Sequence, residues 1–255
     1  MLALAAALSY GAADFCGGLA SRRTSSIAVV VWSQAIGLVV LLAAFSFVHG
    51  VPRGGDLALG ALCGVGGAFA VALLYRALAI GVMGVISPLT AVLAAAIPVL
   101  WAIEHGERPE PLAVLGIAFA LVAVVLVSLA APPADEDAPL ARAPRRHPFP
   151  PGVLSAIAAG IAFGFFFVIL AQTHRDAGLY PLLGTRVVSL SLLSLGALAL
   201  RRPLRVARPG LRTIAFAGAL DMSANVLYVL ASHRGALSIV AVLTSLYPAG
   251  TVALA

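Results

Sequence analysis

The chain has 255 residues, of which 62% are hydrophobic and only 10% are charged. Soluble domains carry about 25% charged residues, so this composition, with a mean hydropathy of +1.06, excludes an ordinary soluble domain and indicates a membrane protein. The net charge of +6 would suggest a nucleic-acid partner for a soluble protein. Here the arginines lie mainly between apolar segments, where they orient a protein in the bilayer. We therefore expect the lipid bilayer, and no nucleic acid, as a partner.

Apolar segments of about 18–25 residues follow one another along the chain, and each is long enough for a helix to cross a hydrocarbon layer of ~30 Å. They predict an all-α fold, a polytopic membrane helix bundle. Most connections are very short, so sequential helices should be antiparallel neighbours. The predicted helices are Leu2–Ala20, Ile27–Val48, Leu57–Ala79, Val82–Ile103, Leu112–Ala131, Val153–Ala171, Leu179–Leu200, Leu211–Ala231 and Ala236–Ala255.

A Pro-rich segment, residues 132–150, divides the chain. Its acidic and then basic composition is typical of a solvated linker. The flanking parts, residues 1–131 with five helices and residues 151–255 with four, are similar at an offset of 153 residues with one later insertion. An odd number of helices in a repeat inverts the second copy in the membrane, as in many secondary transporters. The same symmetry predicts a tenth helix, which we expect to be missing because the sequence ends within its ninth.

Several short motifs occur in an ordered series along both parts of the chain. They are an aromatic-Gly pair in the first helix of each repeat, a run that ends the third helix, a turn before the fifth, an arginine in the seventh and a run in the ninth: Tyr10-Gly11, Phe163-Gly164, Leu74–Leu78, Gly106–Pro109, Arg186 and Thr244–Pro248. In this order and spacing the sequence resembles an EamA-type transporter of the drug/metabolite transporter superfamily. The resemblance implies ten helices in two EamA repeats and a multi-pass protein of a bacterial plasma (inner) membrane. It also implies cytoplasmic termini, whereas the arginine count places the N-terminus outside, so the orientation stays open.

Ionisable side chains deep in a bilayer are costly and usually face the interior of the bundle. Asp221 is the deepest, and Asn225 and Tyr228 follow on the same helix face. Arg186 lies on the preceding helix at a similar depth, so it is the expected partner of Asp221. A paired Asp221 would suit a zwitterionic or anionic substrate, whereas an unpaired one would be a proton carrier. The alternative is a cluster of hydrogen bonds that only holds helices together.

Other side chains inside the predicted helices are further candidates for substrate or ion binding: Asp14, Ser33, Gln34, Tyr75 and Thr90. Pro88 and Pro248 fall inside helices, where proline frees a backbone carbonyl and bends the helix. We consider them candidate gating positions, with plain bends as the alternative. The spacing Gly60-x-x-x-Gly64 is typical of closely packed membrane helices.

We expect a secondary transporter that exports small metabolites or drugs by alternating access, and not an enzyme. The sequence has no nucleotide-binding loop of the type G-x-x-x-x-G-K-[ST]. The five histidines are scattered, and the two cysteines lie in different predicted helices, so we expect neither a cofactor nor a metal site. A non-transporting membrane subunit and an intramembrane enzyme are the alternatives. The sequence does not decide the oligomeric state, and a homodimer remains one option.

Overall fold

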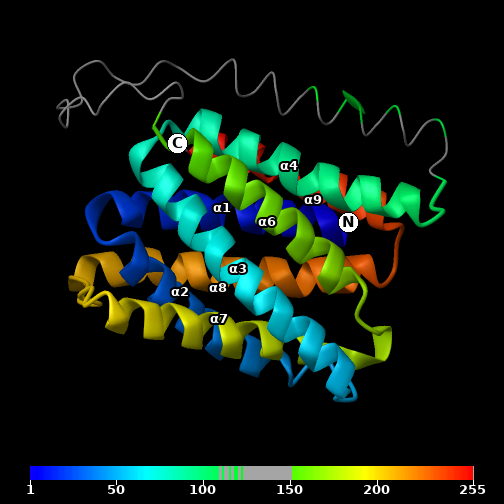
Figure 1. The fold of residues 1–255 in the computed structure, drawn as a ribbon, viewed down its shortest axis with the longest axis horizontal. Coiled ribbons are helices and arrows are strands. Elements are labelled where there is room, and N and C mark those ends of the chain that lie inside the picture. Colours follow the sequence, from blue (N-terminus) through cyan, green and yellow to red (C-terminus); the bar gives the residue numbers. More distant parts are fainter. Residues whose placement is uncertain (109–110, 112–114, 116–117, 120–121, 123–150, 255) are drawn as a thin grey trace.

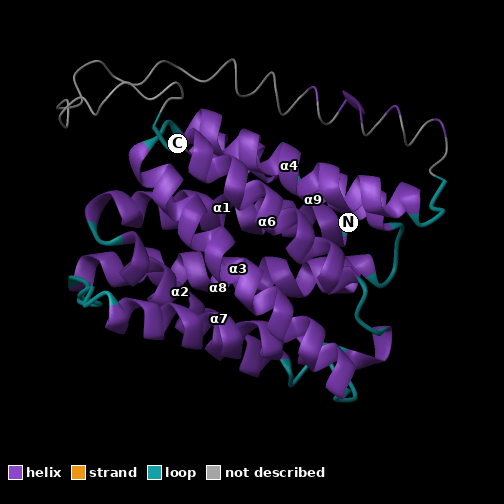
Figure 2. Ribbon diagram, viewed as in Figure 1, coloured by secondary structure: helices purple, strands orange, loops and turns teal. Residues whose placement is uncertain are grey.

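The computed structural model describes residues 1–108, 111, 115, 118–119, 122 and 151–254. Seven helices in this part are long and apolar enough to cross a membrane, and they form one bundle (Figure 1). Short loops join consecutive helices within residues 1–108 and within residues 151–254 (Figure 2). The predicted polytopic helical membrane bundle is therefore confirmed. The long helices are α1 Leu2–Arg23, α2 Ser26–Ala44, α3 Gly54–Ile80, α4 Met83–Glu104, α6 Val153–Ala171, α7 Tyr180–Ala199 and α8 Arg208–Ser232. A short 3-10 turn, η1 Arg175–Ala177, precedes α7.

The ninth predicted segment differs from the structure. Instead of one helix over Ala236–Ala255, the chain forms α9 Leu237–Thr244 and α10 Tyr247–Leu254. The break follows from Pro248, which cannot donate a hydrogen bond to the carbonyl of Thr244 and whose ring collides with that carbonyl in a continuous helix. Pro248 thus belongs to the first turn of α10, whereas Pro88 lies inside α4, which continues past it. The predicted helix Leu112–Ala131 lies mostly, and the linker at 132–150 entirely, outside the described residues.

The helices run between two ends of the bundle that differ in charge. One end, on the right in Figure 1, holds the N-terminus of α1 and the loops that follow α2, α4, α6 and α8. Its acidic residues, Asp56, Glu104, Glu107 and Asp176, are matched in number by Arg53, Arg108, Arg175 and Arg234. We name it the acidic end because, among the described residues, no Asp or Glu lies at the opposite end. We name the opposite end the arginine end for Arg22, Arg23, Arg201, Arg202, Arg205 and Arg212. Among the described residues every Asp and Glu lies at the acidic end or inside the bundle.

Packing between helices interleaves the two parts of the chain. α1 and α2 of the first part pack against α8, whereas α6 and α7 of the second part pack against α3. α4 packs against α6 and α9, and α10 packs against α1. If α1 is exchanged with α6, α2 with α7 and α3 with α8, this pattern of contacts is reproduced. The bundle can therefore be described as two bodies, α1–α2–α8 and α3–α6–α7.

Small residues bring the helices of one body into backbone contact. A Cβ atom on Gly60 of α3 would lie 2.0 Å from the carbonyl oxygen of Pro181 on α7, and one on Gly64 would lie 2.6 Å from that of Thr185. The hydroxyl of Thr185 also donates a hydrogen bond to the carbonyl of Gly60 over 2.9 Å. Close packing of this kind is what the Gly60-x-x-x-Gly64 spacing predicted. It makes α3 and α7 a rigid unit.

Large apolar side chains cover the outside of the bundle. Leu8, Phe69, Leu195 and Phe216, from four different helices, are each more than half exposed. A soluble protein would rarely leave so many large side chains in water, whereas hydrocarbon solvates them without cost. This surface is consistent with a protein surrounded by lipid.

Candidate functional site

The centre of the bundle contains a buried ion pair between α7 and α8. A guanidinium nitrogen of Arg186, Nη2, pairs with Oδ2 of Asp221, and Nη1 donates a hydrogen bond to Oε1 of Gln34 on α2. The hydroxyl of Ser189 donates to the same Gln34 oxygen over 2.9 Å. The side chain of Arg186 is only 4% exposed and that of Asp221 is 22% exposed. Of the two options that the sequence left open for Asp221, the structure has the paired one.

Two further features of this pair bear on ligand binding. Asn225 donates from Nδ2 to the carbonyl oxygen of Asp221 over 2.8 Å and approaches its Oδ1 at 3.4 Å, so one turn of α8 holds the carboxylate in place. Nε of Arg186 is buried and has no acceptor among the described residues. A buried N–H without a partner is rare in proteins. The guanidinium thus keeps one N–H donor that no described residue uses.

The ion pair lines a cavity between the two bodies. Its polar wall contains Gln34, Arg186, Ser189 and Asp221, and its apolar wall contains side chains of α1, α3 and α6. The cavity has about 420 Å³ of empty space, part of which is open to solvent.

An adjoining cavity of about 380 Å³ of empty space reaches Asp14 on α1. Asp221, Phe163 and Phe167 line it as well, so the two cavities share walls. Tyr10 and Tyr247 complete its edge, and the buried hydroxyl of Tyr10 has no hydrogen-bond partner among the described residues. Asp14 is 8% exposed. In the described part of the chain it forms no ion pair.

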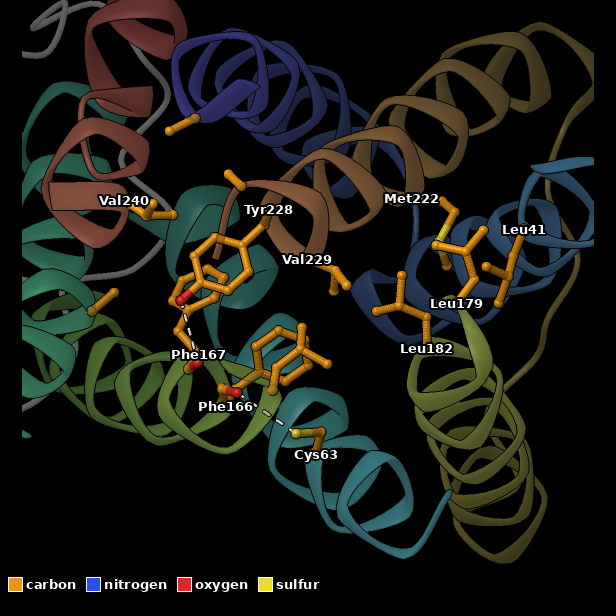
Figure 3. Close-up of a cluster of buried hydrophobic side chains, with 14 residues drawn as sticks. Leu41, Cys63, Phe166, Phe167, Leu179, Leu182, Met222, Tyr228, Val229 and Val240 are labelled. Atoms are coloured by element: carbon orange, nitrogen blue, oxygen red, sulfur yellow. Dashed lines mark hydrogen bonds between the residues drawn. The ribbon is translucent and has the colours of Figure 1, made fainter. Parts of the chain in front are cut away.

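Tyr228 was expected on the same face as Asp221, and the structure places it nearer the acidic end. It is fully buried, its hydroxyl donates to the carbonyl oxygen of Phe167 over 3.2 Å, and its ring centroid lies 4.5 Å from that of Phe167. Figure 3 shows Tyr228, Phe166 and Phe167 packed together, with Val240 of α9 close by. We name Phe166, Phe167 and Tyr228 the aromatic plug. Phe166 and Phe167 also line the cavity, so the plug forms the wall of the cavity toward the acidic end.

The other predicted site residues lie at helix contacts rather than in the lining of these cavities. The hydroxyl of Ser33 donates to its own helix, at the carbonyl of Val30. The hydroxyl of Thr90 on α4 donates to the carbonyl of Ile86 and approaches that of Ala156 on α6. Tyr75 is buried, and its ring occupies the place that a Cβ on Gly17 of α1 would need.

Sequence reasoning missed several residues of the cavity wall. Thr185 and Ser189 lie on either side of Arg186 along α7, at positions that share its helix face or border it. The aromatic wall comes from the Phe-rich run of α6 and from Tyr10, which the sequence singled out only as part of a motif. Thr185 and Ser189 could have been identified from their positions on or beside the helix face of Arg186. Among the described residues, no group of three or more His, Cys, Asp or Glu side chains could hold a metal ion.

The chain is similar to a known protein family and to a solved structure. Residues 1–129 match the EamA-like transporter family, and no curated protein sequence matches the chain significantly. A solved structure, described only as the crystal structure of a protein, superposes with a TM-score of 0.68 over 98% of this chain and 86% of its own. At 19% identity this likeness establishes the fold alone. The resemblance inferred from the motifs is confirmed, because the family match covers half of the sequence: the chain belongs to the EamA-like transporter family.

Proposed function

We propose that this membrane transporter is a secondary transporter that exports small zwitterionic solutes by alternating access, with Arg186 and Asp221 as its binding pair. The observation that carries the proposal is the unpartnered Nε of Arg186 beside a buried ion pair that lines the central cavity. Membership of the EamA-like family supports transport of a small molecule.

The chemistry of the cavity favours a solute that carries both charges. A carboxylate on the solute could bind the guanidinium of Arg186, and an ammonium group could bind Asp221. Such a solute adds no net charge to the interior, so the cost of desolvating it is partly offset by two charge-assisted hydrogen bonds. The aromatic wall formed by Phe163, Phe166 and Phe167 offers apolar contact to the rest of the molecule. Small, partly apolar zwitterions therefore fit this site best.

Alternating access is supported by the way in which the bundle is built. The proposed repeats, residues 1–131 and 151–255, each contribute two helices to one body and one helix to the other, and the cavity lies between the bodies. Rocking of one body against the other would open the cavity at one end and close it at the other. Pro88 in α4 and the break before Pro248 lie in the helices that bridge the bodies, α4 and α9–α10. We retain both prolines as candidate gating positions.

Asp14 is our candidate for the coupling proton. It lines the adjoining cavity together with Asp221, no described cation compensates for its charge, and carboxylates inside membrane helices commonly take part in proton relays. Asp221 already has such a cation in Arg186. The two carboxylates would thus divide the work, with Asp221 binding solute and Asp14 binding the proton. The positive-inside rule would place the arginine end in the cytoplasm, which makes the acidic end the exit.

The test is solute counterflow in proteoliposomes, with a panel of zwitterionic, anionic and cationic metabolites. Arg186→Gln should abolish counterflow of every substrate found. The matched control is Arg76→Gln, which removes an exposed arginine of α3 outside the cavity and should leave counterflow near the wild-type rate. Asp14→Asn should keep counterflow but lose accumulation driven by a proton gradient.

The outcomes separate the rival functions. Counterflow of anions alone would remove the ammonium role of Asp221, and equal loss in Arg186→Gln and Arg76→Gln would remove the binding pair. If the folded wild-type protein moves no solute in either direction, the proposal is wrong and a non-transporting subunit becomes the better explanation.

A further inference from the structure

A carboxylate in the turn after α4 bonds to the beginning of α9. Both carboxylate oxygens of Glu107 lie within 3.3–3.4 Å of the backbone nitrogen of Ser238, and the Ser238 hydroxyl donates to Oε1. Ser238 is the second residue of α9 and is fully buried. The N-cap residue of α9 is Ala236, which has no side-chain acceptor. Glu107 therefore supplies the cap that the sequence of α9 lacks, and its charge suits the positive end of the helix.

This contact joins two parts of the chain that are 131 residues apart in sequence. α9 has only eight residues, and a turn precedes it and a break follows it. Among the described residues, the bonds to Glu107 are the only side-chain hydrogen bonds between α9 and another element. Otherwise α9 is held by apolar packing against α4, α1 and α8. Glu107 is thus the one described side chain that fixes the beginning of α9 by hydrogen bonds.

The beginning of α9 lies at the acidic end, over the aromatic plug. Val240, in the first turn of α9, packs in the same apolar cluster as Phe166, Phe167 and Tyr228, which Figure 3 shows. Tyr228 lies one turn of α8 closer to the acidic end than the cavity residue Asn225. A path from the cavity to the solution at the acidic end must therefore pass the plug. On this side α9 packs against the plug.

We propose that Glu107 is a positioning residue that latches α9 over the aromatic plug and keeps the cavity closed at the acidic end. Release of the Glu107–Ser238 contact accompanies the opening of the transporter at that end. The inference rests on the alternating access proposed above. It also gives a role to the Gly106–Pro109 turn, whose motif the binding site does not explain.

The experiment measures access to the cavity and needs no substrate. In a background with Cys16→Ala and Cys63→Ala, a reporter cysteine replaces Leu182, which is buried in the cavity wall. A membrane-impermeant maleimide is added to one side of sealed vesicles. A separate Val51→Cys protein, labelled at an exposed residue of the acidic end, identifies the side on which that end lies.

Glu107→Ala should raise the labelling rate of the reporter from the acidic end by several-fold. Ser238→Ala, which keeps the backbone N–H, should raise it less, and the double variant should not exceed Glu107→Ala because both remove the same contact. The matched control is Glu104→Ala, which removes an exposed carboxylate one turn away that bonds to no described residue. It should leave the rate unchanged.

Two results would overturn the latch: no change in a folded Glu107→Ala protein, or an equal rise in Glu104→Ala. If Glu107→Ala does not fold, the milder Ser238→Ala variant decides by the same criteria. Labelling requires no transport. If Glu107→Ala raises the labelling rate but the protein shows no counterflow, the proposed function alone is refuted. If the protein shows counterflow but Glu107→Ala leaves the labelling rate unchanged, the latch alone is refuted.

Discussion

Removal of one member of the Arg186–Asp221 pair should destabilise the protein more than removal of both. Loss of one partner from a buried ion pair typically costs about 3–5 kcal/mol, because it leaves an uncompensated charge, whereas replacement of both partners is often neutral. In Asp221→Asn the guanidinium stays buried and charged, since arginine cannot release its proton. The bond to Gln34 compensates for part of the loss, so we expect about 3 kcal/mol, the lower limit of that range.

The reverse variant, Arg186→Met, should be milder. Its orphaned Asp221 is 22% exposed, so the carboxylate retains some hydration, which limits the cost to roughly 1–2 kcal/mol. The double variant Arg186→Met/Asp221→Asn should lie within about 1 kcal/mol of the wild type. It should nevertheless fail to transport, because the binding pair is gone.

The assay is unfolding in mixed detergent micelles, with counterflow measured on the same four proteins. Stability that recovers in the double variant while transport does not would separate the structural role of the pair from its proposed role in binding. The reasoning is refuted if both single variants are as stable as the wild type, or if the double variant is as unstable as the sum of the singles. Either result means that the two charges are not coupled in the folded protein.

Three further predictions concern other parts of the bundle. Gly60→Ala should strongly destabilise the protein, because its Cβ would lie 2.0 Å from a backbone oxygen of α7. Gly66→Ala, whose Cβ has no atom within 4 Å, should be neutral or stabilise the protein by up to about 1 kcal/mol. Thermal unfolding in detergent compares the two variants. Burial lowers the pKa of His233, so the unfolded chain binds a proton at this histidine more tightly than the folded protein does. The contribution of neutral His233 to the free energy of unfolding should therefore be fully present above pH ~6.5 and decrease at lower pH. A profile from pH 7 to 5 that His233→Gln does not flatten would contradict this. Pro248→Ala restores the missing N–H, so it should favour a continuous α9–α10 helix and slow counterflow, and a wild-type rate would show that the break has no role in transport.

Hydropathy and segment length were enough to predict the membrane helices, because the cost of exposing backbone polar groups to lipid leaves few other structures. Depth was enough to bring Arg186 and Asp221 together, since neighbouring helices of similar length align their midpoints. The break before Pro248 was harder to predict. A proline can bend a membrane helix or end it, and here α10 docks on α1, where the Thr251 hydroxyl donates to the carbonyl of Gly11.

The walls of the cavity depend on which helices face one another, and that is a property of the packing rather than of any single helix. Tyr228 shares a helix face with Asp221, yet Phe167 of α6 covers it and makes it part of the plug. Ser33 and Thr90 satisfy their hydroxyls on nearby carbonyls. A polar residue in an apolar helix can therefore either line a cavity or pack at a helix contact. The neighbouring helix decides which of the two occurs.

The interleaving of the two bodies has a consequence for how the protein is made. α1 and α2 are synthesised first, but their main partner α8 begins about 185 residues after α1 ends. At roughly 5–20 residues per second, α1 spends about 10–40 s in the membrane before that partner exists. During this interval Asp14 has neither its cavity nor its neighbours on α8. The insertion machinery, or the nascent α1–α2 hairpin itself, must shelter this carboxylate from lipid until the second part of the chain arrives.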